Sequence, residues 1–212
     1  MAKEQCAKCG GKLGGLLKSV PAFTFTDGKP ICHNCYWQSS FDLFRFKRTF
    51  AEFNQHLGEL ETGKRVFQAL FTGVNAKSIM NMVPLYLAPE LGLLVFFSIP
   101  PVKAIKPKGN QSEARYMVYR YADVLEYSFK QDYAGTIPDP DNVFDNGNPG
   151  TWNNMLTFRF DNPDNHYVIT EHSVSMAPAK ATEVINHFNE LLSGDRSELA
   201  QKADAAIKSV IG

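Results

Sequence analysis

Hydrophobic residues at helical spacing predict a helix in the first third of the chain. We expect Ser40 to cap its N-terminus and Gly58 to end it. The apolar face of this helix would consist of Leu43, Phe46, Phe50, Phe53 and Leu57. Residues 59–83 repeat the spacing less regularly, and they predict a connector with one or two short helices that begins near Thr62.

From Pro84 onward the pattern changes to short apolar runs separated by turns, which is typical of β-strands. The predicted strands cover residues 85–88, 93–99, 115–121, 124–129, 156–160 and 166–169. Residues 132–150 are rich in Asp, Asn, Gly and Pro and predict a long loop. Two amphipathic helices are predicted after the strands, one over 178–193 and one from Asp195 to the end of the chain.

The four cysteines of the chain form two Cys-x2-Cys pairs near the N-terminus. The pairs are Cys6 with Cys9 and Cys32 with Cys35. Each pair can turn two thiolates toward one cation, and two such pairs complete a tetrahedral Zn2+ site. Because protein atoms would fill all four ligand positions, the metal would have no place for a water molecule to activate. We therefore predict one structural zinc ion.

Three other uses of these cysteines stay open from the sequence. Two disulfide bonds would need an oxidising compartment, and a redox pair would need a βαβ context. An iron–sulfur cluster would use the same four thiolates, so spacing alone does not separate zinc from iron. The N-terminus has no apolar stretch to serve as a secretory signal, and we expect a cytoplasmic protein. His33 lies inside the second pair, and we expect it not to be a ligand.

The segment between the cysteine pairs predicts a β-hairpin. Residues 22–26 alternate as a strand, and Asp27-Gly28 gives a tight turn back toward Cys32. The order is then a knuckle (the tight turn that carries a Cys-x2-Cys pair), a hairpin, a second knuckle and a helix. This order is typical of a treble-clef-like zinc finger.

Composition and charge exclude several classes of protein. The 212 residues carry 22 Lys and Arg against 22 Asp and Glu, and 44% are hydrophobic, as in ordinary globular domains. The longest apolar run, 91–102, is interrupted by Gly92, Ser98 and two prolines and is too short to span a membrane. Residues 1–65 hold ten basic against six acidic residues, a net charge of +4. An integral membrane protein, a disulfide scaffold and a strongly basic nucleic-acid coat are therefore not expected.

Two stretches of the chain resemble a known type of protein. The segments Cys6-x2-Cys9-Gly-Gly-Lys-Leu-Gly and Asp27-Gly-Lys-Pro-Ile-Cys32-x2-Cys35-Tyr are similar to the four-cysteine domain of uncharacterised bacterial and phage-borne proteins. In that family the knuckles resemble half of a LIM domain, and a small pleckstrin-homology (PH) or GRAM-like β-barrel follows. Residues 119–127 resemble a strand of such a barrel, and helix 178–193 resembles the helix that closes one of its ends. The family has no established activity.

These observations predict an α+β protein: a zinc finger followed by a mostly antiparallel PH/GRAM-like barrel with C-terminal helices. The expected divisions are a zinc-binding domain over 1–58, a connector over 59–83, a β domain over 84–194 and a last helix over 195–212.

No nucleotide-binding, serine-hydrolase or metalloprotease motif is present in the sequence, so we expect a non-enzymatic adaptor that binds a protein. Two alternatives stay open. The finger, with its basic excess, is a candidate for binding nucleic acid. An anionic membrane surface would be recognised by Lys103, Lys106, Lys108 and Arg115.

Overall fold

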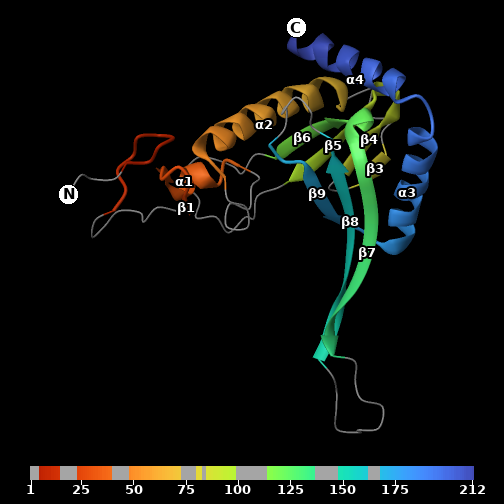
Figure 1. Cartoon of the computed structure of the whole chain (residues 1–212), viewed down its shortest axis with the longest axis horizontal. Coiled ribbons are helices and arrows are strands. Elements are labelled where there is room, and N and C mark those ends of the chain that lie inside the picture. The colour runs from red at the N-terminus through yellow and green to blue at the C-terminus, as the bar shows by residue number, and fades with distance from the viewer. Residues whose placement is uncertain are drawn as a thin grey trace.

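The structure is a computed structural model, which describes residues 5–14, 23–39, 48–72, 80–82, 85–98, 114–136, 148–161 and 168–212. A small N-terminal module and a larger, sheet-rich body are joined by one long helix, α2 (Phe50–Leu70) (Figure 1). The module holds the two-stranded sheet β1 (Phe23–Thr24) and β2 (Pro30–Ile31), followed by the short helix α1 (His33–Tyr36).

The body contains two antiparallel sheets whose strands follow chain order. The first consists of β3 (Met80–Met82), β4 (Leu85–Ala88), β5 (Leu93–Ser98) and β6 (Arg115–Arg120), and the second of β7 (Val124–Thr136), β8 (Asn148–Phe160) and β9 (Glu171–Ser175). Two 3-10 helices, η2 (Pro89–Leu91) and η3 (Tyr121–Asp123), turn the chain before β5 and before β7. The chain ends in α3 (Pro178–Leu192) and α4 (Arg196–Ile211). The paired strands β7 and β8 project far beyond the body (Figure 1).

The main hydrophobic core lies between the two sheets, and α3 closes it on one side. The ring of Phe158 on β8 lies 5.7 Å from Phe96 on β5 and 5.0 Å from Phe188 on α3. The residues here with almost no exposed surface include Leu85, Leu87, Leu94, Tyr119, Leu156, Phe158 and Phe188. Contacts among large aromatic side chains therefore hold the sheets and α3 together.

The first sheet is buried on both faces. Leu94 and Phe96 point into the core between the sheets, whereas Leu93 and Val95 pack against α2 and α4 on the opposite face. The apolar run in β5 is therefore continuous, because neither face of this strand meets water. Helix α4 lies so close to the turn at Gly92 that a Cβ there would overlap the Leu199 carbonyl oxygen.

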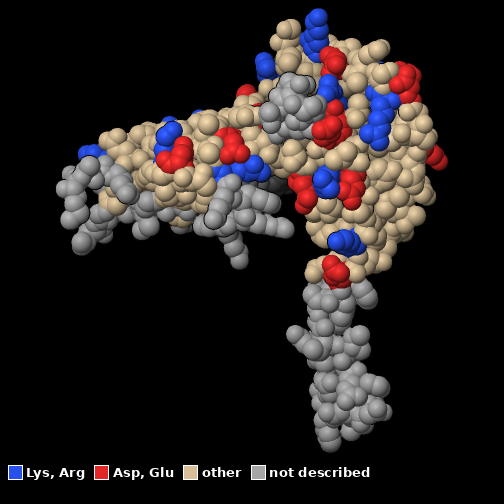
Figure 2. Space-filling model, viewed as in Figure 1, with Lys and Arg blue, Asp and Glu red and all other residues tan. Residues whose placement is uncertain are grey.

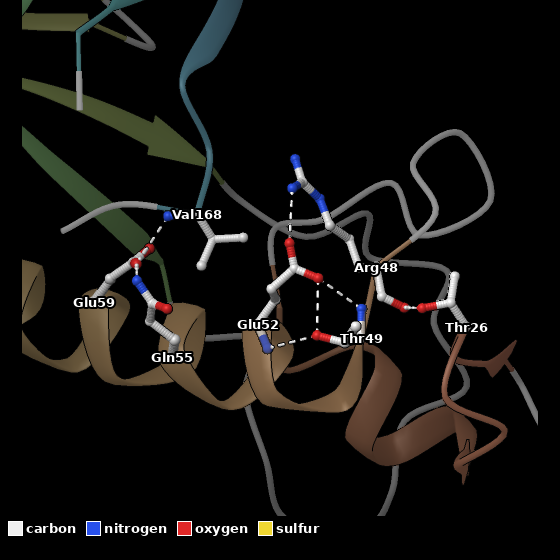
Figure 3. Close-up of polar contacts among 7 residues, drawn as sticks. All are labelled: Thr26, Arg48, Thr49, Glu52, Gln55, Glu59 and Val168. Atoms are coloured by element: carbon white, nitrogen blue, oxygen red, sulfur yellow. Dashed lines mark hydrogen bonds and ion pairs between the residues drawn. The ribbon is translucent and has the colours of Figure 1, made fainter. Parts of the chain in front are cut away.

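The helix predicted between Ser40 and Gly58 differs from helix α2 in where it begins and where it ends. Helix α2 begins after Thr49, whose side chain and backbone form a reciprocal capping box with Glu52 (Figure 3). Gly58 lies in the helix interior, and α2 continues through residues that we predicted as a connector. Residues 40–47 lie outside the described part of the chain.

Most predicted strands of the body are confirmed, but four features differ. The predicted loop 132–150 is shorter than expected, because β7 extends to Thr136 and β8 starts at Asn148. The last strand lies at 171–175, Val168 and Ile169 of the predicted strand 166–169 are outside any strand, and residues 166 and 167 lie outside the described part of the chain. Strand β3 was not predicted. In the described residues none of the sheets closes into a barrel. Both C-terminal helices are confirmed.

A partly buried polar cluster lies where α2 meets the two sheets. The Tyr119 hydroxyl is 2.8 Å from the Ile169 carbonyl oxygen and 2.6 Å from Nε2 of His172. A hydroxyl has one hydrogen, so if Tyr119 donates to Ile169 then Nε2 of His172 must donate to Tyr119. Burial, together with the nearby His56, lowers the pKa of His172 to about 3 and keeps its imidazole neutral.

We expect this neutral histidine to make the fold acid-sensitive. The unfolded chain binds a proton on His172 below about pH 6.5, but the folded chain does so only near pH 3. The free energy of unfolding should therefore fall by up to about 1.4 kcal/mol per pH unit between these limits. Urea titrations of the wild type and of His172→Phe at several pH values would measure the difference. Parallel pH profiles for the two proteins would contradict the expectation.

Candidate metal centre

The structure brings the four cysteine sulfurs together at the end of the module. The Sγ atoms of Cys6, Cys9, Cys32 and Cys35 all lie within 4.8 Å of one another. The sulfurs of Cys9 and Cys32 are 3.9 Å apart. Tetrahedral coordination with Zn–S bonds of ~2.3 Å places two sulfurs about 3.8 Å apart. The four thiols are thus spaced to bind one metal ion.

The first cysteine pair sits in a tight turn that glycine makes possible. The N–H of Gly10 donates to the Cys6 carbonyl oxygen at 2.8 Å, and Gly10 adopts a φ of 70°, which other residues rarely take. The N–H of Cys6 donates to the carbonyl oxygen of Gly11 at 2.8 Å. A Cβ on Gly11 would lie 3.3 Å from the Cys9 sulfur. Gly10 therefore permits the tight turn, and Gly11 leaves room beside the Cys9 sulfur.

The hairpin β1–β2 delivers the second pair to the first. The N–H of Ala7 donates to the carbonyl oxygen of Pro30 at 2.8 Å, so the first turn is bonded to β2. The N–H of Cys32 lies 3.4 Å from the Cys6 sulfur. Cys32 is the N-cap of α1, and Cys35 lies inside that helix. A helix thus starts within the second knuckle itself, earlier than we predicted.

The surroundings of the sulfurs differ in their effect on ionisation. Burial opposes ionisation of Cys6, but backbone N–H groups, including that of Cys32, outweigh it and lower its pKa to about 6. Burial and the neighbouring thiols raise the pKa of Cys35. A bound cation reverses the second effect, because a metal ion deprotonates the thiols that bind it. The site is therefore suited to a cation that offsets the charge of several thiolates.

The metal centre is part of a hydrophobic cluster that reaches the body. Cys6 and Cys35 are buried with Phe25 and Ile31 of the module and with Phe53 of α2. The predicted packing of the aromatic stripe against a core is confirmed here for Phe50 and Phe53. Val168, from the segment just before β9, also belongs to this cluster. One apolar cluster therefore joins three distant parts of the chain.

Hydrogen bonds strengthen both ends of this junction. The Arg48 carbonyl oxygen accepts from the N–H and the hydroxyl of Thr26, which ties the hairpin to the start of α2 (Figure 3). Glu59 of α2 accepts the N–H of Val168 at 2.9 Å (Figure 3). The module and the body are thus held to the same helix by polar contacts as well as by packing.

Other predicted site residues are not at this centre. His33 is exposed and is not among the clustered ligands. Arg115 begins β6, where burial lowers the pKa of its guanidinium to about 10. Lys103, Lys106 and Lys108 lie outside the described residues. Val168 and Tyr119 were not recognised from the sequence as parts of the junction, since no local pattern links them to the cysteines.

Comparisons with family models, with curated proteins and with solved structures found no match to this chain. Of the resemblance to a bacterial and phage family, the cysteine cluster is what the structure supports. Among the described helices, none is both long and apolar enough to cross a membrane.

Proposed function

We propose that the chain is a non-enzymatic adaptor in which one structural zinc ion holds the N-terminal module. The observation that carries this proposal is the convergence of four cysteine sulfurs within 4.8 Å of one another. In our proposal the module is a treble-clef-like zinc finger, since its order is turn, hairpin and helix around one centre.

Zinc suits this site better than the other uses of four cysteines. All four cysteines are free, and the 3.9 Å between the Cys9 and Cys32 sulfurs far exceeds the ~2.05 Å of a disulfide. A redox pair would need only one of the two turns, whereas both turns here face one centre. An iron–sulfur cluster uses the same ligands, and the experiment below separates it from zinc.

A structural role follows from how the centre is enclosed. Four protein ligands leave no coordination position for a substrate or a reactive water. His56 is buried in the junction beside Glu59, and His172 is partly buried there beside Tyr119, each within hydrogen-bond distance of its partner. These contacts give both histidines a part in holding the fold together. We therefore propose that the chain acts by binding, with a protein as its partner.

For the body we propose a PH/GRAM-like domain. Two antiparallel meanders share one core, and the apolar helix α3 packs against that core after the last strand. This layout agrees with the resemblance at residues 119–127 and 178–193. Binding to an anionic membrane gains no support from Arg115, since its guanidinium is half-buried.

The proposal is tested by purifying the intact chain from its native host and measuring bound metal and co-purifying molecules together. One zinc ion and one protein partner per chain, with thiols that react only after chelation, would support it. Iron with visible absorption, or metal-free protein with four reactive thiols, would overturn the zinc site. Enriched anionic lipid or nucleic acid in place of a protein would overturn the adaptor function.

A further inference from the structure

We propose that two copies of this chain pair through strand β7 and form an antiparallel six-stranded sheet across a two-fold axis. Strand β7 is at the edge of its sheet, and within the described part of the chain only β8 pairs with it. A long edge strand is a template for pairing with another chain. The inference does not depend on the metal centre.

Hydrogen bonds at the ends of β8 show which backbone groups of β7 point outward. Phe160 donates its N–H to Thr170, and Met176 donates to Asn154, so even-numbered residues of β8 bond toward β9. Odd-numbered residues of β8 then bond toward β7, where their partners are even-numbered. The outward-pointing N–H and C=O groups in the regular part of β7 therefore belong to Tyr127, Phe129 and Gln131.

The other end of this edge is already occupied. The carbonyl oxygen of Val124 accepts a hydrogen bond from the Arg196 guanidinium at 2.9 Å. The register of β7 shifts between Val124 and Glu126, which marks a bulge. A second strand can thus pair regularly with β7 from Glu126 onward but not through the bulge.

Charge favours two registers for a pair of β7 strands: a centre at Gln131 would set Lys130 against Asp132. We propose the register centred on Ser128, because its ion pairs join the existing pair of Glu126 and Arg159. Two antiparallel copies centred on Ser128 place Glu126 of one copy opposite Lys130 of the other, twice in the dimer. In the same register the outward-pointing Tyr127 pairs with Phe129. A centre at Glu126 or Lys130 would set like charges opposite each other, and a centre at Phe129 would set Glu126 against Asp132. A centre at Tyr127 would set Glu126 against Ser128 without an ion pair.

The side chains of this register also favour the pairing. Lys130 is exposed and has no ion-pair partner among the described residues, so it is available to a second chain. Glu126 already accepts from Arg159 at 2.7 Å, which would extend the ion pairs across three strands. Leu125 is 57% exposed, and Tyr127 and Phe129 are only partly buried. Figure 2 shows side chains of both charges gathered on the face over β7 and β8.

Charge reversal with sedimentation velocity of the full metal-bound chain tests the proposal. We expect the wild type to show a concentration-dependent monomer–dimer equilibrium. Lys130→Glu and Glu126→Lys should each raise the dimer Kd by about tenfold, because symmetry applies each change twice. The double variant should regain the wild-type Kd, and a mixture of the two single variants should form a heterodimer. Lys208→Glu, which makes the same change of charge on α4, should leave the Kd unchanged.

Two results of this sedimentation experiment would overturn the proposal. One is a wild type that stays monomeric at every concentration tested while its thermal unfolding shows an intact fold. The other is a dimer whose Kd is the same in both single variants, which would place the contact elsewhere. A further variant, Gln131→Pro, removes an outward N–H without breaking the ladder to β8. It should abolish the dimer, and a dimer that survives it would also contradict the pairing.

Discussion

Replacing Cys35 by serine should release the metal and unfold the N-terminal module while the body stays folded. Structural zinc contributes on the order of 10–16 kcal/mol to small domains, more than the packing of this small module against α2 can replace. Its cluster contains the buried Cys6 and Cys35, whereas the two clusters of the body contain no cysteine. Metal analysis together with hydrogen exchange would show the loss of protection confined to the module and the first turns of α2.

The matched control for this change is His33→Ala. His33 is exposed beside the same turn and is not among the clustered ligands, so the variant should keep its metal and its protection. If Cys35→Ser kept one metal ion per chain, three cysteines and another group would be sufficient to hold it. The four-cysteine site would then be wrong.

The second large effect is expected at Gly63 of α2. A Cβ at this position would overlap the Tyr116 carbonyl oxygen and lie 3.0 Å from the carbonyl carbon. Both groups are backbone, so Gly63→Ala should force α2 away from β6. This also disturbs the ring of Phe67, which stacks on Tyr116 with centroids 4.0 Å apart. We expect the free energy of unfolding to fall by about 1–3 kcal/mol.

Helix α2 supplies its own control, because a Cβ added at Gly58 would have no neighbouring atom within 4 Å. Gly58→Ala should raise the free energy of unfolding by up to about 1 kcal/mol, since alanine favours the helix. Urea unfolding of both variants measures the two opposite changes. If Gly63→Ala raised the free energy of unfolding as Gly58→Ala does, the backbones of α2 and β6 would not approach so closely at Gly63.

The contrast between these glycines explains why the sequence predicted α2 wrongly. By its low intrinsic helix propensity, glycine at positions 58 and 63 predicts that a helix stops or weakens there. Packing overrides propensity at Gly63, where only glycine lets the helix backbone lie against the carbonyl oxygen of Tyr116. The capping box of Thr49 and Glu52 was visible in the sequence, but the apolar stripe suggested an earlier start.

Elements with a local signal were predicted well. The strands over 85–88, 93–98 and 115–120 and both C-terminal helices are close to their predicted limits. The lengths of β7 and β8 were underestimated because their ends are held by pairing with each other, which no single stretch of sequence reveals. Pairing between distant strands also decides that the two sheets remain separate and do not close into a barrel in the described part of the chain.

The convergence of the four cysteines was predicted, because two closely spaced Cys-x2-Cys pairs are the pattern that surrounds a metal. The packing of Phe50 and Phe53 against a core was also expected, but the contact with the segment before β9 was not predicted. Val168 joins the cluster from more than a hundred residues away, and its N–H is held by Glu59. Such a contact depends on how the whole chain folds and leaves no periodic signal near either residue.

The position of Val168 has a consequence for how the protein is made. The ribosome releases the chain from its N-terminus, so all four cysteines emerge long before the segment that completes their hydrophobic cluster. Helix α2 and the first sheet are likewise synthesised before the second sheet that shares their core. A nascent chain that captures metal early therefore carries an apolar surface around Phe53, which stays uncovered until synthesis has passed residue 168.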